Sequence, residues 1–100
     1  MTAEHKGGLV KNRVRLVHEL RVDSILNFLQ QEQTLTHRDC EDIRNDPLRN
    51  KQAELLLDIL GRKPDSSYDC FVTALRQSGQ QHLANLLQPQ VSNLTGNILI

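Results

Sequence analysis

Several kinds of residue are scarce in this 100-residue chain, and each scarcity excludes something. There is no tryptophan, and the only aromatic residues are Phe28, Tyr68 and Phe71, so leucine and other aliphatic side chains must pack the core. No stretch approaches the ~18 consecutive apolar residues of a membrane span, and the N-terminus lacks the apolar region of a signal peptide. The length suits one domain, which we expect in the cytoplasm.

Cysteine occurs only at Cys40 and Cys70, without the CxxC spacing of a metal or redox site. A disulfide framework is not expected in a reducing compartment. Cys70 stands in an apolar helical register beside Phe71. We expect it to be a small buried thiol rather than a nucleophile, because a reactive thiolate needs exposure and a nearby cation.

The residues that catalysis or cofactor binding would need form no motif. The four histidines fall on separate segments, and the chain has neither an HExxH sequence nor a glycine-rich phosphate loop. Asp39, Glu41 and Asp42 lack the glycine turn and the ligand spacing of an EF-hand loop. We therefore expect a domain with no enzymatic activity, no cofactor and no metal ion.

The formal net charge is zero, but the charges are segregated along the chain. Residues 1–22 hold five basic and two acidic residues, and residues 23–46 hold two and six. The pattern then reverses to four and two over residues 47–64, and residues 65–100 hold one and two. A helical bundle built from these blocks would have a basic and an acidic face, which favours head-to-tail assembly. Balanced charge argues against a nucleic-acid partner.

Apolar residues recur at helical spacing almost throughout, and no segment alternates as a strand does. The first helix is predicted over residues 4–20, with one apolar face made of Leu9, Val10, Leu16, Val17 and Leu20. The second is predicted to begin with Asp23 as its cap, and its apolar residues are Val22, Ile25, Leu26 and Leu29.

A short third helix is predicted to begin at a capping box formed by Thr36 and Asp39 and to run toward Asn45. It is polar, and only Cys40 and Ile43 should face inward. We expect it to contribute least to the core and to be the most mobile helix.

Three further helices are predicted in the second half of the chain. Asp46 and Pro47 suit the N-cap and first position of the fourth helix. Its apolar residues are Leu48, Leu55, Leu56, Ile59 and Leu60, with Gly61 and Pro64 as end signals. The fifth contains Tyr68, Phe71, Val72 and Leu75 and ends at Gly79; the sixth contains Leu83, Leu86 and Leu87 and stops at Pro89. Residues 90–100 are expected to be a tail or the start of a linker.

Six helices in this order, with glycines in the first and a short third, resemble the caspase recruitment domain of the death-fold superfamily. The resemblance covers residues 9–87. Residues 11–23 are most similar to the prodomains of initiator caspases, whereas Arg44-Asn45-Asp46-Pro47 and residues 83–87 are similar to the N-terminal domain of the apoptosome-forming ATPase. The resemblance implies an all-α fold, a six-helix antiparallel Greek-key bundle, with residues 1–89 as the domain.

The resemblance also implies a module that binds another caspase recruitment domain through opposed charged faces. The predicted basic face consists of Lys11, Arg13, Arg15, Arg49 and Lys51. The predicted acidic face consists of Asp23, Asp39, Glu41 and Asp42. The expected function is to recruit an initiator caspase to its activating platform in apoptosis, with self-association at high concentration and no membrane partner.

Other interpretations stay open at this point. The chain could belong to an innate-immune receptor, an adaptor or an inhibitory decoy of the same family, and its parent protein could be a protease or an ATPase. From another class, a helical nucleic-acid binder would place Lys11, Arg13 and Arg15 on phosphates. The same basic cluster could also be an ordinary solvated helix surface.

Overall fold

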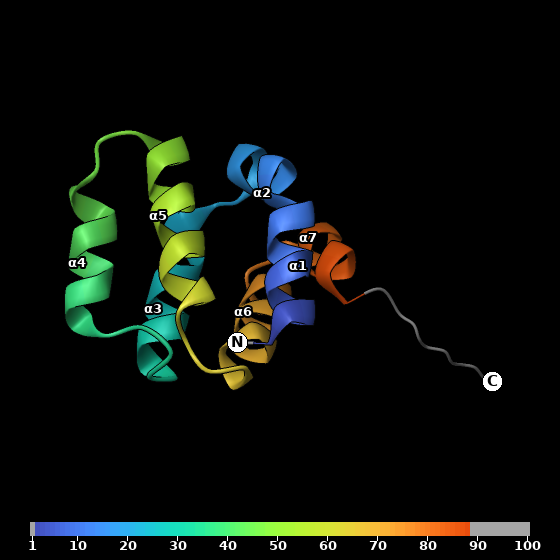
Figure 1. The fold of residues 1–100 in the computed structure, drawn as a ribbon. Helices are drawn as coiled ribbons and strands as arrows, with labels where there is room; N and C mark the ends of the chain where they lie inside the picture. Colours follow the sequence, from blue (N-terminus) through green and yellow to red (C-terminus); the bar gives the residue numbers. More distant parts are fainter. Residues whose placement is uncertain (1, 89–100) are drawn as a thin grey trace.

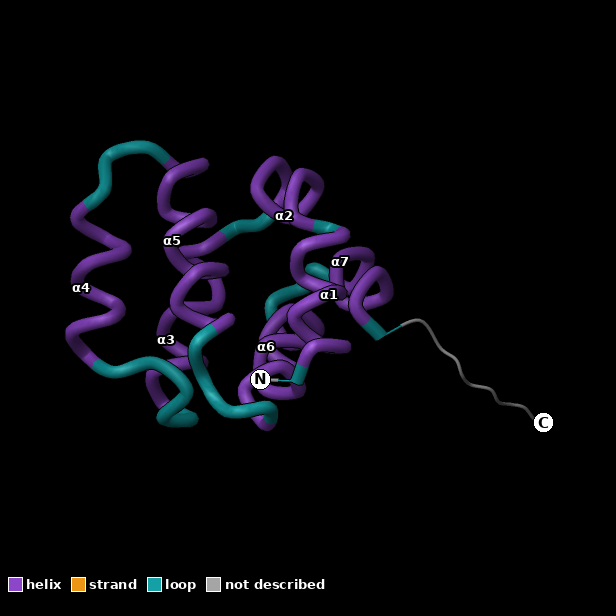
Figure 2. Tube along the Cα trace, viewed as in Figure 1, coloured by secondary structure: helices purple, strands orange, loops and turns teal. Residues whose placement is uncertain are grey.

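In the computed structural model, which describes residues 2–88, the chain folds into a bundle of helices (Figure 1). Along this part the structure contains helices and loops but no strand (Figure 2). The helices are α1 (Ala3–Lys11), α2 (Arg13–Glu19), α3 (Val22–Gln31), α4 (His37–Asn45), α5 (Arg49–Gly61), α6 (Ser66–Gln77) and α7 (Gln81–Leu87). The predicted tail, residues 90–100, lies outside the described residues.

The predicted first helix is interrupted at Asn12, which separates α1 from α2. The side-chain amide of Asn12 donates to the Gly8 carbonyl at 2.8 Å, the same oxygen that its backbone N–H reaches at 3.2 Å. Asparagine side chains compete with the helical backbone in this way. The prediction of one continuous helix was therefore wrong at this residue, and α1 with α2 are the two halves of the first of six helices.

The starts of the helices confirm one prediction and correct two. Thr36 accepts from the backbone N–H of Asp39 while the Asp39 carboxylate accepts from that of Thr36, each at 3.0 Å, so the capping box is present. Asp23 is not a cap, because α3 starts one residue before it. Asp46 ends α4 and accepts from the backbone N–H of Leu48, so α5 begins at Arg49, later than predicted.

Two helices end in the same hydrogen-bonded turn, in which a residue with positive φ stands just beyond the helix. Gly79, with φ of 80°, follows α6, and the backbone N–H of Gln80 donates to the Leu75 carbonyl at 2.8 Å. This confirms Gly79 as an end signal. After α3 the equivalent position is Gln33, with φ of 62°, where a side chain is less favourable than glycine.

A single core of mostly aliphatic side chains runs through the bundle, as the composition predicted. The largest fully buried side chains are Phe71, Leu16, Leu20, Ile25, Leu26, Leu29, Leu35, Ile43, Leu56, Leu60, Leu75 and Leu83. Val10 and Leu48, predicted to face inward, are instead 71% and 59% exposed. Cys40 is fully buried, and burial raises the pKa of its thiol, whereas Cys70 is only partly buried.

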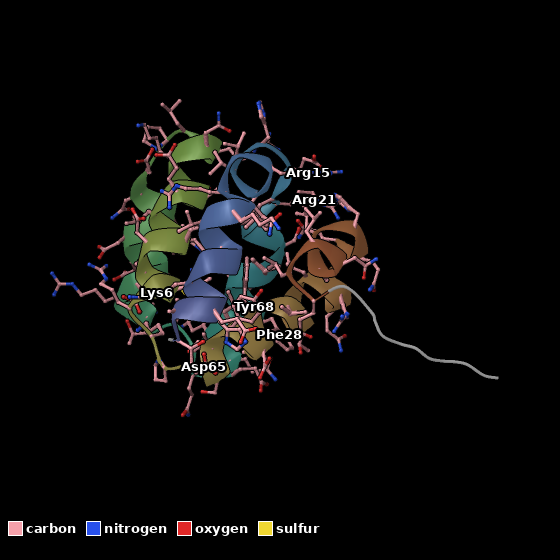
Figure 3. All side chains as sticks on the ribbon, turned by 45° about the vertical axis from the view of Figure 1, so that its right-hand side comes forward. Lys6, Arg15, Arg21, Phe28, Asp65 and Tyr68 are labelled. Carbon is pink, nitrogen blue, oxygen red and sulfur yellow. The ribbon has the colours of Figure 1, made fainter. Side chains whose placement is uncertain are left out.

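Side-chain contacts hold the start of α1 against the start of α6. The ring of His5 stacks on that of Tyr68 with their centroids 4.0 Å apart, and His5 Nδ1 bonds to the Asp65 carboxylate. Figure 3 shows Asp65 and Tyr68 together beside the start of α1. The backbone N–H of Thr2 also donates to Asp65. This hydrogen bond, and to a smaller extent the one with His5, holds the pKa of Asp65 below its ordinary value. These contacts fix α1 in place beside α5.

Candidate docking surfaces

The predicted basic residues lie mainly where α2 packs against the start of α5, two helices that adjoin in Figure 1. Arg49, in the first turn of α5, donates to the backbone carbonyl of His18 in α2 at 3.2 Å. Lys51 lies one turn from Glu54 on the same helix, at 3.8 Å. Lys11 is exposed and has no ion pair among residues 2–88.

Arg13 joins the two helices of this surface. Its guanidinium donates to the carboxylate of Asp58 in α5 at 3.1 Å. The side chains are 38% and 58% exposed, so solvent screens the pair. Asp58 was not among the predicted site residues, because it is 45 residues from Arg13 along the chain.

Arg15 is directed elsewhere and does not join the cluster at α5. It donates to Glu19 at 2.9 Å, and Glu19 also contacts His82 of α7 at 3.0 Å. The hydrogen bond from Arg15 contributes most to holding the pKa of Glu19 below its ordinary value. Arg15 therefore belongs to an α2–α7 contact, and the five predicted basic residues do not all converge.

Two shallow grooves lie on either side of Arg13, and both open against α5. The first, of about 230 Å³, lies between α1 and α5 and is lined by Lys6, Leu9, Val10, Arg13, Leu57, Asp58, Gly61 and Arg62. The second, of about 250 Å³, lies between α2 and α5 and is lined by Arg13, Val14, Val17, His18, Asn50 and Glu54.

The first groove adds two cations that sequence reasoning missed, Lys6 and Arg62. Figure 3 shows Lys6 extending from α1 on the side away from Tyr68. Both residues are exposed, and neither has an ion pair among residues 2–88. They could not be found from local spacing, because they are 56 positions apart and come together only through the packing of α1 on α5.

On the predicted acidic face, Asp39 is committed to the fold. Besides its capping bond, its carboxylate accepts from the Lys63 amine at 2.9 Å, and its side chain is only 21% exposed. Burial raises the pKa of Asp39, but the hydrogen bonds from Thr36 and Lys63 outweigh it and leave the pKa below its ordinary value. Asp39 ties α4 to the segment after α5.

The remaining acidic residues are more available. Glu41 contacts His37 one turn away at 3.4 Å, and both side chains are well exposed. Asp42 on α4 and Asp23 on α3 are exposed and have no ion pair among the described residues. The open part of the acidic face is therefore the outer side of α4, with Asp23 on the neighbouring helix.

Two further findings concern residues 2–88 alone. None of their helices is long and apolar enough to cross a membrane. No three of their histidine, cysteine, aspartate or glutamate side chains are grouped so that they could hold a metal ion.

Comparison with known protein families identifies the family to which this chain belongs. The family model of the caspase recruitment domain matches residues 9–90. The chain belongs to the caspase recruitment domain family. The resemblance drawn from the sequence is thereby confirmed, and so is the all-α, six-helix bundle of the death fold, with a bend in its first helix. A caspase recruitment domain is a non-catalytic interaction module.

Two curated relatives are similar over nearly the whole chain. Human apoptotic protease-activating factor 1 is 29% identical over 99 residues, which is 96% of this chain and 8% of that protein. Chicken caspase-2 is 28% identical over 98 residues, which is 98% of this chain and 23% of that protein. The chain thus spans less than a quarter of the length of either relative. The name of the human relative refers to apoptosis, and the chicken relative is a caspase.

Proposed function

We propose that residues 1–89 form a homotypic docking domain that recruits an initiator caspase to its activating platform in the cytoplasm. The partner is another caspase recruitment domain, bound by apposition of a basic and an acidic surface. The whole protein's role in apoptotic signalling is part of this proposal, because the chain covers 8% and 23% of its curated relatives.

The observation that supports the proposal best is the separation of two oppositely charged surfaces on different helices. The basic surface consists of Arg13, Lys6, Arg62, Arg49 and Lys51, from α1, α2, α5 and the residue after it. The acidic surface consists of Glu41 and Asp42 on α4, together with Asp23 on α3. Complementary surfaces of this kind steer association and fix the register of docking.

The direct test is calorimetric binding to the segment of human apoptotic protease-activating factor 1 that matches this chain. Arg13→Glu should lower the affinity at least tenfold, because it opposes like charges across the interface. A variant with Glu41→Lys and Asp42→Lys tests the other surface. Asp39 is not used here, since its loss would also disturb α4.

Both variants should keep the helix content of the parent, since the three side chains are at least partly exposed. If neither variant changes binding, the charged surfaces are ordinary solvated helix faces and the proposal is wrong. Competing duplex DNA serves as a second control, because displacement of the protein partner by DNA would instead favour a nucleic-acid-binding function.

A further inference from the structure

The two grooves beside Arg13 follow one line along α5. The α5 residues that line them are Asn50, Glu54, Leu57, Asp58 and Gly61. Their spacing of four, three, one and three positions places them on one face of the helix. From the first to the last they span about 17 Å at the helical rise of 1.5 Å per residue. We call this line of two grooves the α5 furrow.

The α5 furrow has an exposed aliphatic side chain in each of its two grooves. Val10, at the first groove, is 71% exposed, and Val14, at the second, is 77% exposed. Leu48 is the third large hydrophobic residue exposed in the described part of the chain, and it lines neither groove. Because both side chains line the furrow, a partner seated in it would cover them.

The Arg13–Asp58 ion pair crosses the α5 furrow at the point where its two grooves meet. Arg13 lines both grooves, and Asp58 lines the first. On the basic surface this is the ion pair that joins two helices, whereas Lys51 pairs within α5. Asp58 makes no other side-chain hydrogen bond or ion pair within residues 2–88, so its release from Arg13 breaks nothing else.

We propose that Asp58 is an internal competitor for docking: it holds Arg13 across the α5 furrow until a carboxylate of a second copy of the chain replaces it. The inference rests on the proposed function and adds a restraint to it. The exchange is electrostatically balanced, because Arg13 leaves one carboxylate and meets another. Since surface ion pairs contribute little, a partner that also covers Val10 and Val14 can displace Asp58.

The second copy supplies the complementary surface with α4. Glu41 and Asp42 are exposed there, and Asp42 has no ion pair among the described residues. On the first copy, Lys6 and Arg62 at the first groove also lack ion pairs within the described residues. A copy docked with α4 over the first groove therefore brings two carboxylates to two unpaired cations and to Arg13.

The test is self-association of the 100-residue chain, measured by sedimentation at several concentrations. Asp58→Asn should strengthen association about fivefold, because it frees Arg13. Glu54→Gln is the matched control: it removes the same charge from the same face of α5 but releases Lys51 rather than Arg13. Because the Lys51–Glu54 pair is exposed, lies at 3.8 Å and stays within one helix, this variant should change association less than about twofold.

A double-mutant cycle separates competition from a general change of charge. In an Arg13→Gln background, Asp58→Asn should have no effect, because there is no longer a guanidinium to release. The inference is overturned if the gain from Asp58→Asn persists in that background, if Glu54→Gln gives the same gain, or if Asp58→Asn gives none.

The apolar part of the α5 furrow has its own test. Replacing Val10 and Val14 together by Ser should weaken self-association about fivefold or more, whereas Leu48→Ser should leave it unchanged. All three side chains are exposed, so the variants should fold. Equal effects of the two substitutions would overturn the furrow as the docking site. The chain could fail to self-associate and still bind the relative's segment in a way that Arg13→Glu weakens. That result would overturn the inference about Asp58 and leave the proposed function standing.

Discussion

At the scale of single residues, Asp39 illustrates how one carboxylate can serve two structural purposes. It completes the capping box of α4 and receives the Lys63 amine. The sequence predicted the first of these contacts from a three-residue spacing. The second depends on the packing of α4 against α5, and it gives a predicted docking residue a structural contact as well.

Asp39→Asn should lower the free energy of unfolding by about 0.5–1.5 kcal/mol near neutral pH, because the charge-assisted bond with Lys63 is lost. The pKa of Asp39 is lowered in the folded protein, so the parent's advantage is complete above its ordinary value of 3.8 and disappears as the pH falls through the lower folded value. Denaturant unfolding at several pH values measures this, and a difference between the proteins that stays constant with pH would contradict it.

Phe71 is the second residue whose role follows from its surroundings. It is fully buried and supplies much of the scarce aromatic volume of the core. Phe71→Ala should therefore cost about 3–5 kcal/mol through lost burial and a residual cavity. For a domain of this size that is a large part of the total stability. Thermal unfolding measures the loss, and a midpoint within about two degrees of the parent would exclude a central role for Phe71.

At the scale of elements, local sequence signals explain the start of α4 and the end of α6. Thr36 and Gly79 do what their residue types favour. Gln33 does not, because it occupies a position with φ of 62° for which a β-carbon is unfavourable. The chain keeps this turn because the backbone N–H groups of Thr34 and Leu35 both reach the Leu29 carbonyl.

Gln33→Gly should therefore raise the free energy of unfolding by about 0.5–1 kcal/mol. Gly79→Ala should lower it by a similar amount, because alanine would be forced to positive φ. Gly61→Ala is the matched control: this glycine ends α5, has no positive φ, and has open space where a β-carbon would stand. Chemical denaturation of the three variants checks the signs, and a loss at Gly61 equal to that at Gly79 would refute the explanation.

The bend between α1 and α2 is the element that local pattern failed to predict. Apolar spacing continues across Asn12, so the sequence pattern predicts one continuous helix. The Asn12 side chain lies 3.5 Å from the Leu86 carbonyl as well as bonding to Gly8, so a residue 74 positions away contributes to the place of the break. Val10, which the prediction placed in the buried stripe of this helix, is exposed in the structure.

At the scale of the whole molecule, the proposed interface is rich in exposed charge, and its strength should depend on ionic strength. Exposed pairs are screened over about 8–10 Å at physiological salt, and each contributes only ~0.2–1 kcal/mol. Association should therefore weaken as salt rises, and the dilute chain should be mainly monomeric. Sedimentation at several salt concentrations measures both. A tight dimer that ignores salt would instead indicate an apolar interface, and the two charged surfaces would be ordinary solvated helix faces.

The sequence alone determined that the fold is all-helical, because helical periodicity, capping residues and turn glycines act between neighbours in the chain, and its resemblance to the caspase recruitment domain indicated the family. It also placed the charges in blocks. Only the tertiary structure decided which charges remain available: Asp58 reaches Arg13 across 45 residues, and Lys63 reaches Asp39 across 24. Electrostatic attraction depends on distance through space, and that distance is fixed only when α2 and α4 pack against α5.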